Sequence, residues 1–173
     1  MKIRNARKAD AQKIHDIYGQ YVPYDYVTFT IDNPSVEQYA ANIEEYSKHY
    51  PYLVAVDNDD EILGYVCGHS FRPHDAYKWN VESTIILSQK APKRAHIASK
   101  LYAEFFKLLK ERGYKYVYAV ICDNNDVSIN FHEALGFKKA GHLENAGYKM
   151  SKWIGVYFYV LQIDTLDNVK EPF

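Results

Sequence analysis

The spacing of apolar residues in the first part of the chain predicts a strand followed by two helices. Residues 3–5 have the length of a short strand. The next apolar residues repeat at helical spacing, and they are Ile14, Ile17, Tyr18 and Tyr21. A second helix begins after Pro34, because Ser35 and Gln38 have the spacing of a capping box. Its apolar side, formed by Tyr39, Ile43 and Tyr46, is expected to cover one face of a sheet.

The pattern of apolar and polar residues in the middle of the chain predicts a β-hairpin and one further strand. Two apolar runs, 52–57 and 61–70, are separated by three residues, Asn58-Asp59-Asp60. This arrangement is typical of two antiparallel strands joined by a tight turn. A polar and aromatic stretch, 71–79, leads to residues 81–88, whose β-branched side chains favour a strand. A charged loop, QKAPKRAH, follows it.

The second half of the chain predicts two helices among three strands. Residues 97–112 form a helix whose apolar face holds Ile97, Leu101, Phe105, Leu108 and Leu109. Gly113 stands at its C-terminal cap. Further elements are a buried strand at 115–121, a helix at 128–135 preceded by the capping residues Asn124-Asn125-Asp126, and strands near 137–143 and 153–163. The order predicts an α/β sandwich in which helices cover both faces of a mixed sheet.

Composition narrows the class of protein. A chain of 173 residues, 47% hydrophobic, is of single-domain size, so residues 1–173 are expected to form one domain with a loosely held tail at 165–173. The formal net charge of −1 provides no basic excess for nucleic acid. No run reaches the roughly 20 apolar residues of a membrane span, and the polar N-terminus is unlike a signal peptide. We therefore expect a cytoplasmic protein with a small-molecule partner.

Several common chemistries lack their motifs. The sequence has no glycine-rich dinucleotide loop, no Gly-Lys-Ser/Thr phosphate loop and no Gly-x-Ser-x-Gly elbow. The cysteines, Cys67 and Cys122, lie in apolar runs without a Cys-x-x-Cys pair, and the seven histidines form no ligand cluster. We expect no metal site.

The chain resembles the GCN5-related N-acetyltransferase (GNAT) family in two parts of its sequence. The first runs from VESTIILS (81–88) through QKAPKRAH to IASKLYAEFF, and the second comprises YVYAVI (116–121) and NNDVSINFHEALGF (124–137). The phosphinothricin N-acetyltransferase-like branch fits best, because VTF (27–29), FRPHDAYKW (71–79), GYK (147–149) and Trp153 occur in its order. The resemblance spans residues 2–163. It implies a mostly antiparallel mixed sheet in which a splayed parallel strand pair holds acetyl-coenzyme A (acetyl-CoA).

The resemblance assigns an acetyl-CoA loop that places backbone N–H groups at a helix N-terminus around the pyrophosphate. Its residues here are Lys93, Arg94, Ala95, His96, Ile97, Ala98 and Ser99. His96 stands where the family has glycine, so its Cβ must tolerate the loop conformation or its imidazole must supply a donor. Without the resemblance, Lys93 and Arg94 would be read as a solvated basic loop.

The resemblance also assigns the transfer chemistry. A free alkyl amine titrates near ~10, so a base is useful at neutral pH, and Glu82 matches the acidic position of the family. Considered alone, Glu82 would be a strand-end carboxylate in an ion pair. The backbone at Ile85, Ile86 and Leu87 is expected to hold the pantetheine and polarise the thioester carbonyl, although these side chains also suit a core.

Two further positions match coenzyme-side residues of the family. Asn125 corresponds to a coenzyme-binding asparagine, and His132, seven residues later, to a proposed acid for the leaving thiolate. An imidazole with a pKa near ~6.5 exchanges protons at neutral pH. The alternatives are a helix cap for Asn125 and a packing role for His132.

On the acceptor side, the branch places Phe29, Arg72, Tyr77 and Tyr148 around the pocket. A guanidinium can grip a carboxylate or phosphinate with two hydrogen bonds, which suits an amino-acid-like amine such as phosphinothricin or methionine sulfoximine. A surface role for Arg72 is the alternative.

The resemblance implies a homodimer that transfers acetyl by direct attack in a ternary complex. The competing functions are a non-catalytic acyl-CoA-binding module and a protein or peptide N-acetyltransferase.

Overall fold

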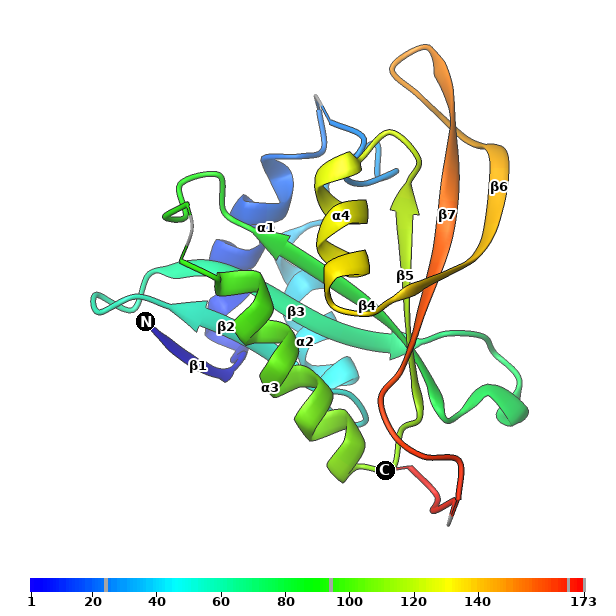
Figure 1. Cartoon of the computed structure of the whole chain (residues 1–173). Helices are drawn as coiled ribbons and strands as arrows, with labels where there is room; N and C mark the ends of the chain where they lie inside the picture. The colour runs from blue at the N-terminus through cyan, green and yellow to red at the C-terminus, as the bar shows by residue number, and fades with distance from the viewer. Residues whose placement is uncertain (24, 94, 168, 173) are drawn as a thin grey trace.

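The computed structural model describes residues 1–23, 25–93, 95–167 and 169–172. In these residues seven strands form one sheet, in the order β1-β2-β3-β4-β5-β7-β6 (Figure 1). Neighbouring strands run antiparallel except for β4 and β5, which are parallel. The strands are Lys2–Asn5 (β1), Tyr52–Val56 (β2), Ile62–Ser70 (β3), Asn80–Leu87 (β4), Tyr116–Cys122 (β5), Lys138–Lys149 (β6) and Lys152–Gln162 (β7). This arrangement confirms the predicted fold class.

The helices divide between the two faces of the sheet (Figure 1). They are η1 (Lys8–Asp10), α1 (Ala11–Gly19), α2 (Val36–Ser47), η2 (Asp75–Tyr77), α3 (Ile97–Glu111) and α4 (Asp126–Ala134). All five residues of β2 are buried: Val54 packs in the cluster that contains α1 and α2, whereas Leu53 and Ala55 pack in the cluster that contains α3. A strand covered on both faces loses the alternation of a half-exposed strand. Within the described residues no helix combines the length and the apolarity needed to cross a bilayer.

Two helix starts follow from capping side chains. The Oγ of Ser35 accepts a hydrogen bond from the Gln38 N–H at 3.3 Å, as the capping-box spacing predicts. The Oδ1 of Asn125 accepts from the Ser128 N–H at 3.1 Å, so α4 begins at Asp126, two residues earlier than predicted. Helix α1 ends at Gly19, and Tyr21 instead donates its hydroxyl to the Leu87 carbonyl at 2.8 Å.

Strand β6 extends well beyond the predicted 137–143. Most of β6 is exposed, apart from the buried Lys149 at its end, and its register shifts between Lys139 and Gly141 and between Leu143 and Gly147. A strand of this kind shows no regular alternation of apolar and polar residues. Met150 and Ser151 join β6 to β7, and both have left-handed φ angles, 51° and 60°. Two such residues in a two-residue loop match the twist of the flanking strands.

Strands β4 and β5 pair only at their beginnings. The parallel register joins Asn80 to Tyr116, Val81 to Val117 and Glu82 to Tyr118, and the described residues continue it no further. At the point of separation the Ser83 hydroxyl donates to the Tyr118 carbonyl at 3.1 Å, replacing a ladder hydrogen bond. The edge of β4 beyond Glu82 is therefore available to a ligand lying between the two strands.

We expect Leu101→Ala to lower the free energy of unfolding by about 2–5 kcal/mol, because this fully buried side chain of α3 would leave a cavity against the sheet. Urea denaturation checks this. Leu166→Ala, the same change at a side chain that is 53% exposed, should alter stability by less than about 0.5 kcal/mol. Equal losses in the two variants would contradict the core assignment.

Candidate active site

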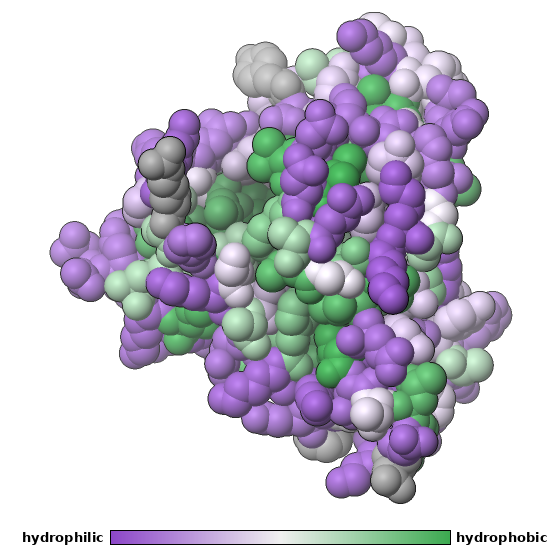
Figure 2. Space-filling model, viewed as in Figure 1, coloured by the Kyte–Doolittle hydropathy of each residue, from purple (hydrophilic) through white to green (hydrophobic). Residues whose placement is uncertain are grey.

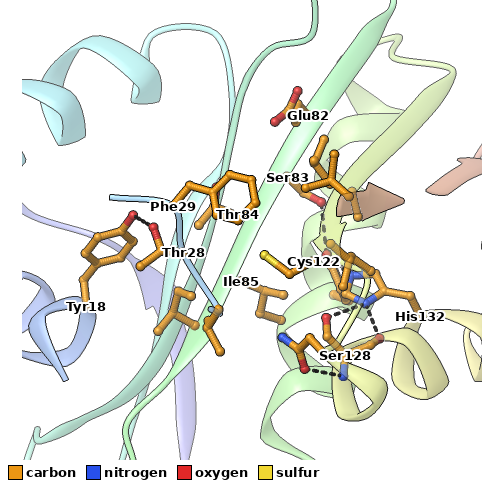
Figure 3. Close-up of a pocket in the computed structure, with 18 residues that line it drawn as sticks. Tyr18, Thr28, Phe29, Glu82, Ser83, Thr84, Ile85, Cys122, Ser128 and His132 are labelled. Atoms are coloured by element: carbon orange, nitrogen blue, oxygen red, sulfur yellow. Dashed lines mark hydrogen bonds between the residues drawn. The ribbon is translucent and has the colours of Figure 1, made fainter. Parts of the chain in front are cut away.

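A cavity of about 240 Å³ occupies the gap between the separated strands. Its walls come from β4, β5, α4 and the segment that contains Thr28 and Phe29 (Figure 3). Glu82 lies at one end of the residues drawn, and Ser128 and His132 lie toward the other (Figure 3). The separated strands thus enclose a carboxyl group, several hydroxyl groups and an imidazole.

A second, larger cavity of about 510 Å³ continues from the first. The two share Val27, Ile85, Ile86, Asn125, Ser128 and His132. The second also reaches Leu87 and Ala98, at the start of α3, and the apolar side chains of Val127 and Phe131. Figure 2 shows apolar, hollowed surface on the face that carries α3 and α4. Together the cavities form a channel from the N-terminal end of α3 to Glu82, suited to a long, largely apolar arm.

Glu82 provides a basic group at the inner end of the channel. In the sheet it stands between His69 of β3 and Tyr118 of β5, and its side chain is 24% exposed. Burial raises the pKa of Glu82, while the positive charges of Arg72 and of His69 in its protonated form act in the opposite direction. A carboxylate with a raised pKa is a stronger base than one in water.

The ring of His132 is held at both nitrogens. Nδ1 lies 2.8 Å from the Ser128 carbonyl, an acceptor only, so this nitrogen carries the proton and donates. Nε2 lies 2.9 Å from the hydroxyl of Tyr102, which in turn lies 3.0 Å from the Ser83 hydroxyl. Burial lowers the pKa of His132, against the opposing effect of the Ser128 hydrogen bond. In its neutral form Nε2 accepts from the Tyr102 hydroxyl, and this hydrogen bond joins α3 to α4.

Hydroxyl groups line the wall opposite α4. The Tyr18 hydroxyl contacts that of Thr28 (Figure 3), and it lies 2.6 Å from the hydroxyl of Thr30. Lys149 secures this wall from β6, donating to the carbonyls of Asp25 at 2.7 Å and Thr28 at 2.6 Å. The polar wall therefore depends on residues far apart in the sequence.

Three of the four predicted acceptor-pocket residues lie outside both cavities. Phe29 lines the smaller cavity and packs against Gly147, where an added Cβ would lie 2.5 Å from the ring. Arg72, Tyr77 and Tyr148 are exposed, and Arg72 lies over the Phe71 ring at 4.9 Å. Their roles toward an acceptor stay predictions.

The predicted coenzyme residues divide between the channel and the start of α3. Ile85, Ile86, Leu87, Ala98 and Asn125 line the channel, so Asn125 is both the cap of α4 and a cavity residue. Lys93, Ala95, His96 and Ser99 lie in the preceding loop and the first helical turn, and Ile97 is buried in the core. Arg94 lies outside the described residues.

His96 adopts the conformation that glycine favours. Its φ of 52° and ψ of 33° are left-handed, and it is the residue that precedes the first turn of α3. Histidine tolerates this region better than β-branched residues do. The loop geometry thus persists without glycine.

Sequence reasoning missed Ser83, Tyr102, Tyr18 and Lys149. Tyr102 lies on the apolar side of a helix and gives the pattern of a core residue.

In the described part of the chain no three His, Cys, Asp or Glu side chains gather as metal ligands.

A family model described as an acetyltransferase (GNAT) domain matches residues 3–157. The chain therefore belongs to the GNAT acetyltransferase family, and it is an enzyme of the acyltransferase class. The predicted family is confirmed.

The chain is also similar to named relatives and solved structures over most of its length. The chain is 34% identical to a phosphinothricin N-acetyltransferase of Streptomyces viridochromogenes over 92% of this chain and 86% of the relative. It is 27% identical to an L-amino acid N-acyltransferase of Escherichia coli K12, over 95% of each. A phosphinothricin acetyltransferase from Sinorhizobium meliloti, crystallised with acetyl-CoA, superposes with a TM-score of 0.90 at 29% identity, covering 99% of this chain and 92% of that one.

We expect His96→Gly to raise the free energy of unfolding by about 1 kcal/mol, because glycine has no Cβ to oppose the left-handed conformation. Thermal unfolding without ligand checks this. Ala103→Gly, an exposed position within the same helix, should instead lose about 0.5–1 kcal/mol. Destabilisation in both variants would show that the imidazole of His96 contributes more than its backbone geometry costs.

Proposed function

We propose that this enzyme transfers an acetyl group from acetyl-CoA to the primary amine of a small amino-acid-like acceptor, of the phosphinothricin or methionine sulfoximine type. The amine attacks the thioester directly while both substrates are bound. The observation that carries the proposal is the half-buried carboxyl of Glu82, at the inner end of a channel between two strands that have separated.

The channel accounts for both substrates. The pantetheine arm of acetyl-CoA would lie between β4 and β5, against Ile85, Ile86 and Leu87, with free backbone N–H groups directed at the thioester carbonyl. Lys93, Arg94, Ala95, His96, Ile97, Ala98 and Ser99 would surround the pyrophosphate, where the N-terminus of α3 favours an anion. Asn125 would contact the arm from the other side.

Transfer requires one proton to leave the amine and one to reach the leaving thiolate. We assign the first to Glu82, whose pKa is raised by burial. For the second, we assign an imidazolium at His132: its Nε2 proton would pass to the Tyr102 oxygen as the Tyr102 hydroxyl gives its own proton to the thiolate, which leaves a neutral ring. Burial lowers the pKa of His132, so the imidazolium gives up this proton readily. His132 would then act together with Tyr102.

The acceptor side favours a small molecule. A cavity of about 240 Å³ accommodates an amino acid better than a folded protein segment. The hydroxyls of Tyr18 and Thr28 offer hydrogen bonds to polar acceptor groups, and Phe29 offers an apolar contact. Arg72, Tyr77 and Tyr148 would complete recognition from outside the cavity. A homodimer and a cytoplasmic location remain our further proposals.

The first test measures thiol release from acetyl-CoA with phosphinothricin, methionine sulfoximine, free amino acids, polyamines and short peptides. We expect turnover on a carboxylate-bearing small amine. Cofactor binding without release for any acceptor would favour a binding module, and a preference for peptides would favour protein acetylation.

We expect Glu82→Gln to lower kcat/KM by about 100-fold or more, because an amide cannot accept the proton of the amine. In the wild type, kcat/KM should fall as pH decreases through the raised pKa of Glu82, since the base is present only above that pKa. The acid limb should disappear in the variant. Glu144→Gln, an exposed carboxylate on β6, is the matched control. An unchanged acid limb in Glu82→Gln would remove Glu82 from this role.

Cys122 lines the reaction cavity, so a covalent acetyl-cysteine route needs a direct test. Burial raises the pKa of this thiol to about 11. The thiol therefore stays almost entirely protonated at pH 7, whereas the thiolate is the nucleophile. We expect Cys122→Ala to keep kcat within about twofold, and the wild type with acetyl-CoA alone to gain no acetyl mass. Cys67→Ala controls for loss of a buried cysteine. Acetylated Cys122 together with an inactive variant would establish the covalent route.

A further inference from the structure

Glu82 must lose the proton that it takes from each acceptor amine before it can act again. This need rests on the function proposed above. We propose that His69 accepts this proton from Glu82 and releases it to solvent, so that it acts on the reaction through Glu82.

The sheet places the two side chains on the same face. His69 of β3 and Glu82 of β4 are register partners in the antiparallel pair, and side chains directly opposite each other project to one side. His69 Nε2 lies 4.0 Å from Glu82 Oε1. A small side-chain rotation or one bridging water would complete the contact, as is common in enzymes without substrate.

The imidazole is oriented to accept. Nδ1 of His69 lies 3.4 Å from the Ser70 carbonyl, which can only accept a hydrogen bond. This contact favours the neutral ring with its proton on Nδ1, which leaves the lone pair on Nε2, the ring nitrogen that lies 4.0 Å from Glu82 Oε1. The ring of Tyr46 packs beside His69, with centroids 6.1 Å apart, and limits its movement.

The position of His69 suits transfer to water. Glu82 is among the residues that line the reaction cavity, whereas His69 is outside that set and its side chain is 31% exposed. Once an acceptor and acetyl-CoA fill the cavity, water can reach Glu82 from that side less easily. The imidazole offers a route on the other side.

Other groups near Glu82 are poorly suited to this transfer. Arg72 carries a guanidinium, which offers hydrogen-bond donors and has no lone pair to accept a proton. Burial raises the pKa of Tyr118, the register partner from β5, and that of Tyr46 beside His69, so both phenols keep their protons at neutral pH. Of the described groups that face this carboxyl, His69 is the one with an imidazole, whose free ring nitrogen can accept a proton and whose protonated form can donate it.

The step conserves its single proton. The O–H bond of protonated Glu82 breaks as an N–H bond forms at Nε2 of His69, leaving a carboxylate and an imidazolium. The imidazolium then gives the same proton to water or buffer. No oxidant or other reactant is needed.

The test compares His69→Gln with wild type in a buffer that exchanges protons poorly, and then with increasing free imidazole. We expect kcat to fall about tenfold, less than the ~100-fold loss of a missing base, because water still reaches a partly exposed Glu82. The KM values should change little. Added imidazole should restore kcat in the variant and leave the wild type unaffected.

Two comparisons separate this role from a structural one. His49→Gln, at an exposed histidine that is not among the groups acting on Glu82, should match the wild type with and without imidazole. Acetyl-CoA affinity and thermal unfolding of His69→Gln should equal those of the wild type, and His69→Asn should repeat its kinetics. Unchanged kcat, or a loss that imidazole does not restore, would overturn the proposal. A wild type that acetylates no amine would instead refute the proposed function.

Discussion

The whole site depends on the separation of β4 from β5 after the Glu82–Tyr118 pair. A buried backbone group without a partner costs about 1–3 kcal/mol, so two central strands part only where other groups take over. The Ser83 hydroxyl does so for the Tyr118 carbonyl, and the Tyr21 hydroxyl does so for the carbonyl of Leu87. Between these two points the edge of β4 faces the channel. An extended ligand with amide groups can complete that edge.

Burial within this gap shifts pKa values in opposite directions at its two ends. At one end it raises the pKa of Glu82 and so strengthens a base. At the other it lowers the pKa of His132 and so favours a neutral imidazole joined to Tyr102. In both cases burial opposes the charged form of the group, which is the carboxylate at one end and the imidazolium at the other. The same physical cause thus distinguishes the two ends of the channel.

Site residues that belong to a contiguous motif could be predicted from the sequence, whereas those brought together only by folding could not. Glu82, Ile85 and Asn125 each belong to a contiguous motif, and all three line the cavity between the strands. His96 was identified as the unusual residue of its loop, and its left-handed backbone shows why glycine is the common choice there. Arg72 and Tyr148 were also read from motifs, yet the structure leaves both exposed, because order along a motif does not determine the direction of a side chain.

Periodicity and capping residues determined the order of the helices and strands, since they report which side of each element is buried. The tertiary structure decided which polar atoms meet. Tyr102 and His132 are 30 positions apart, and Lys149 reaches the Asp25 carbonyl across 124 positions. Neither contact leaves a periodic trace, because a buried tyrosine or lysine looks the same in sequence whatever its partner is. Only folding of the sheet and packing of its helices bring these groups within hydrogen-bond distance.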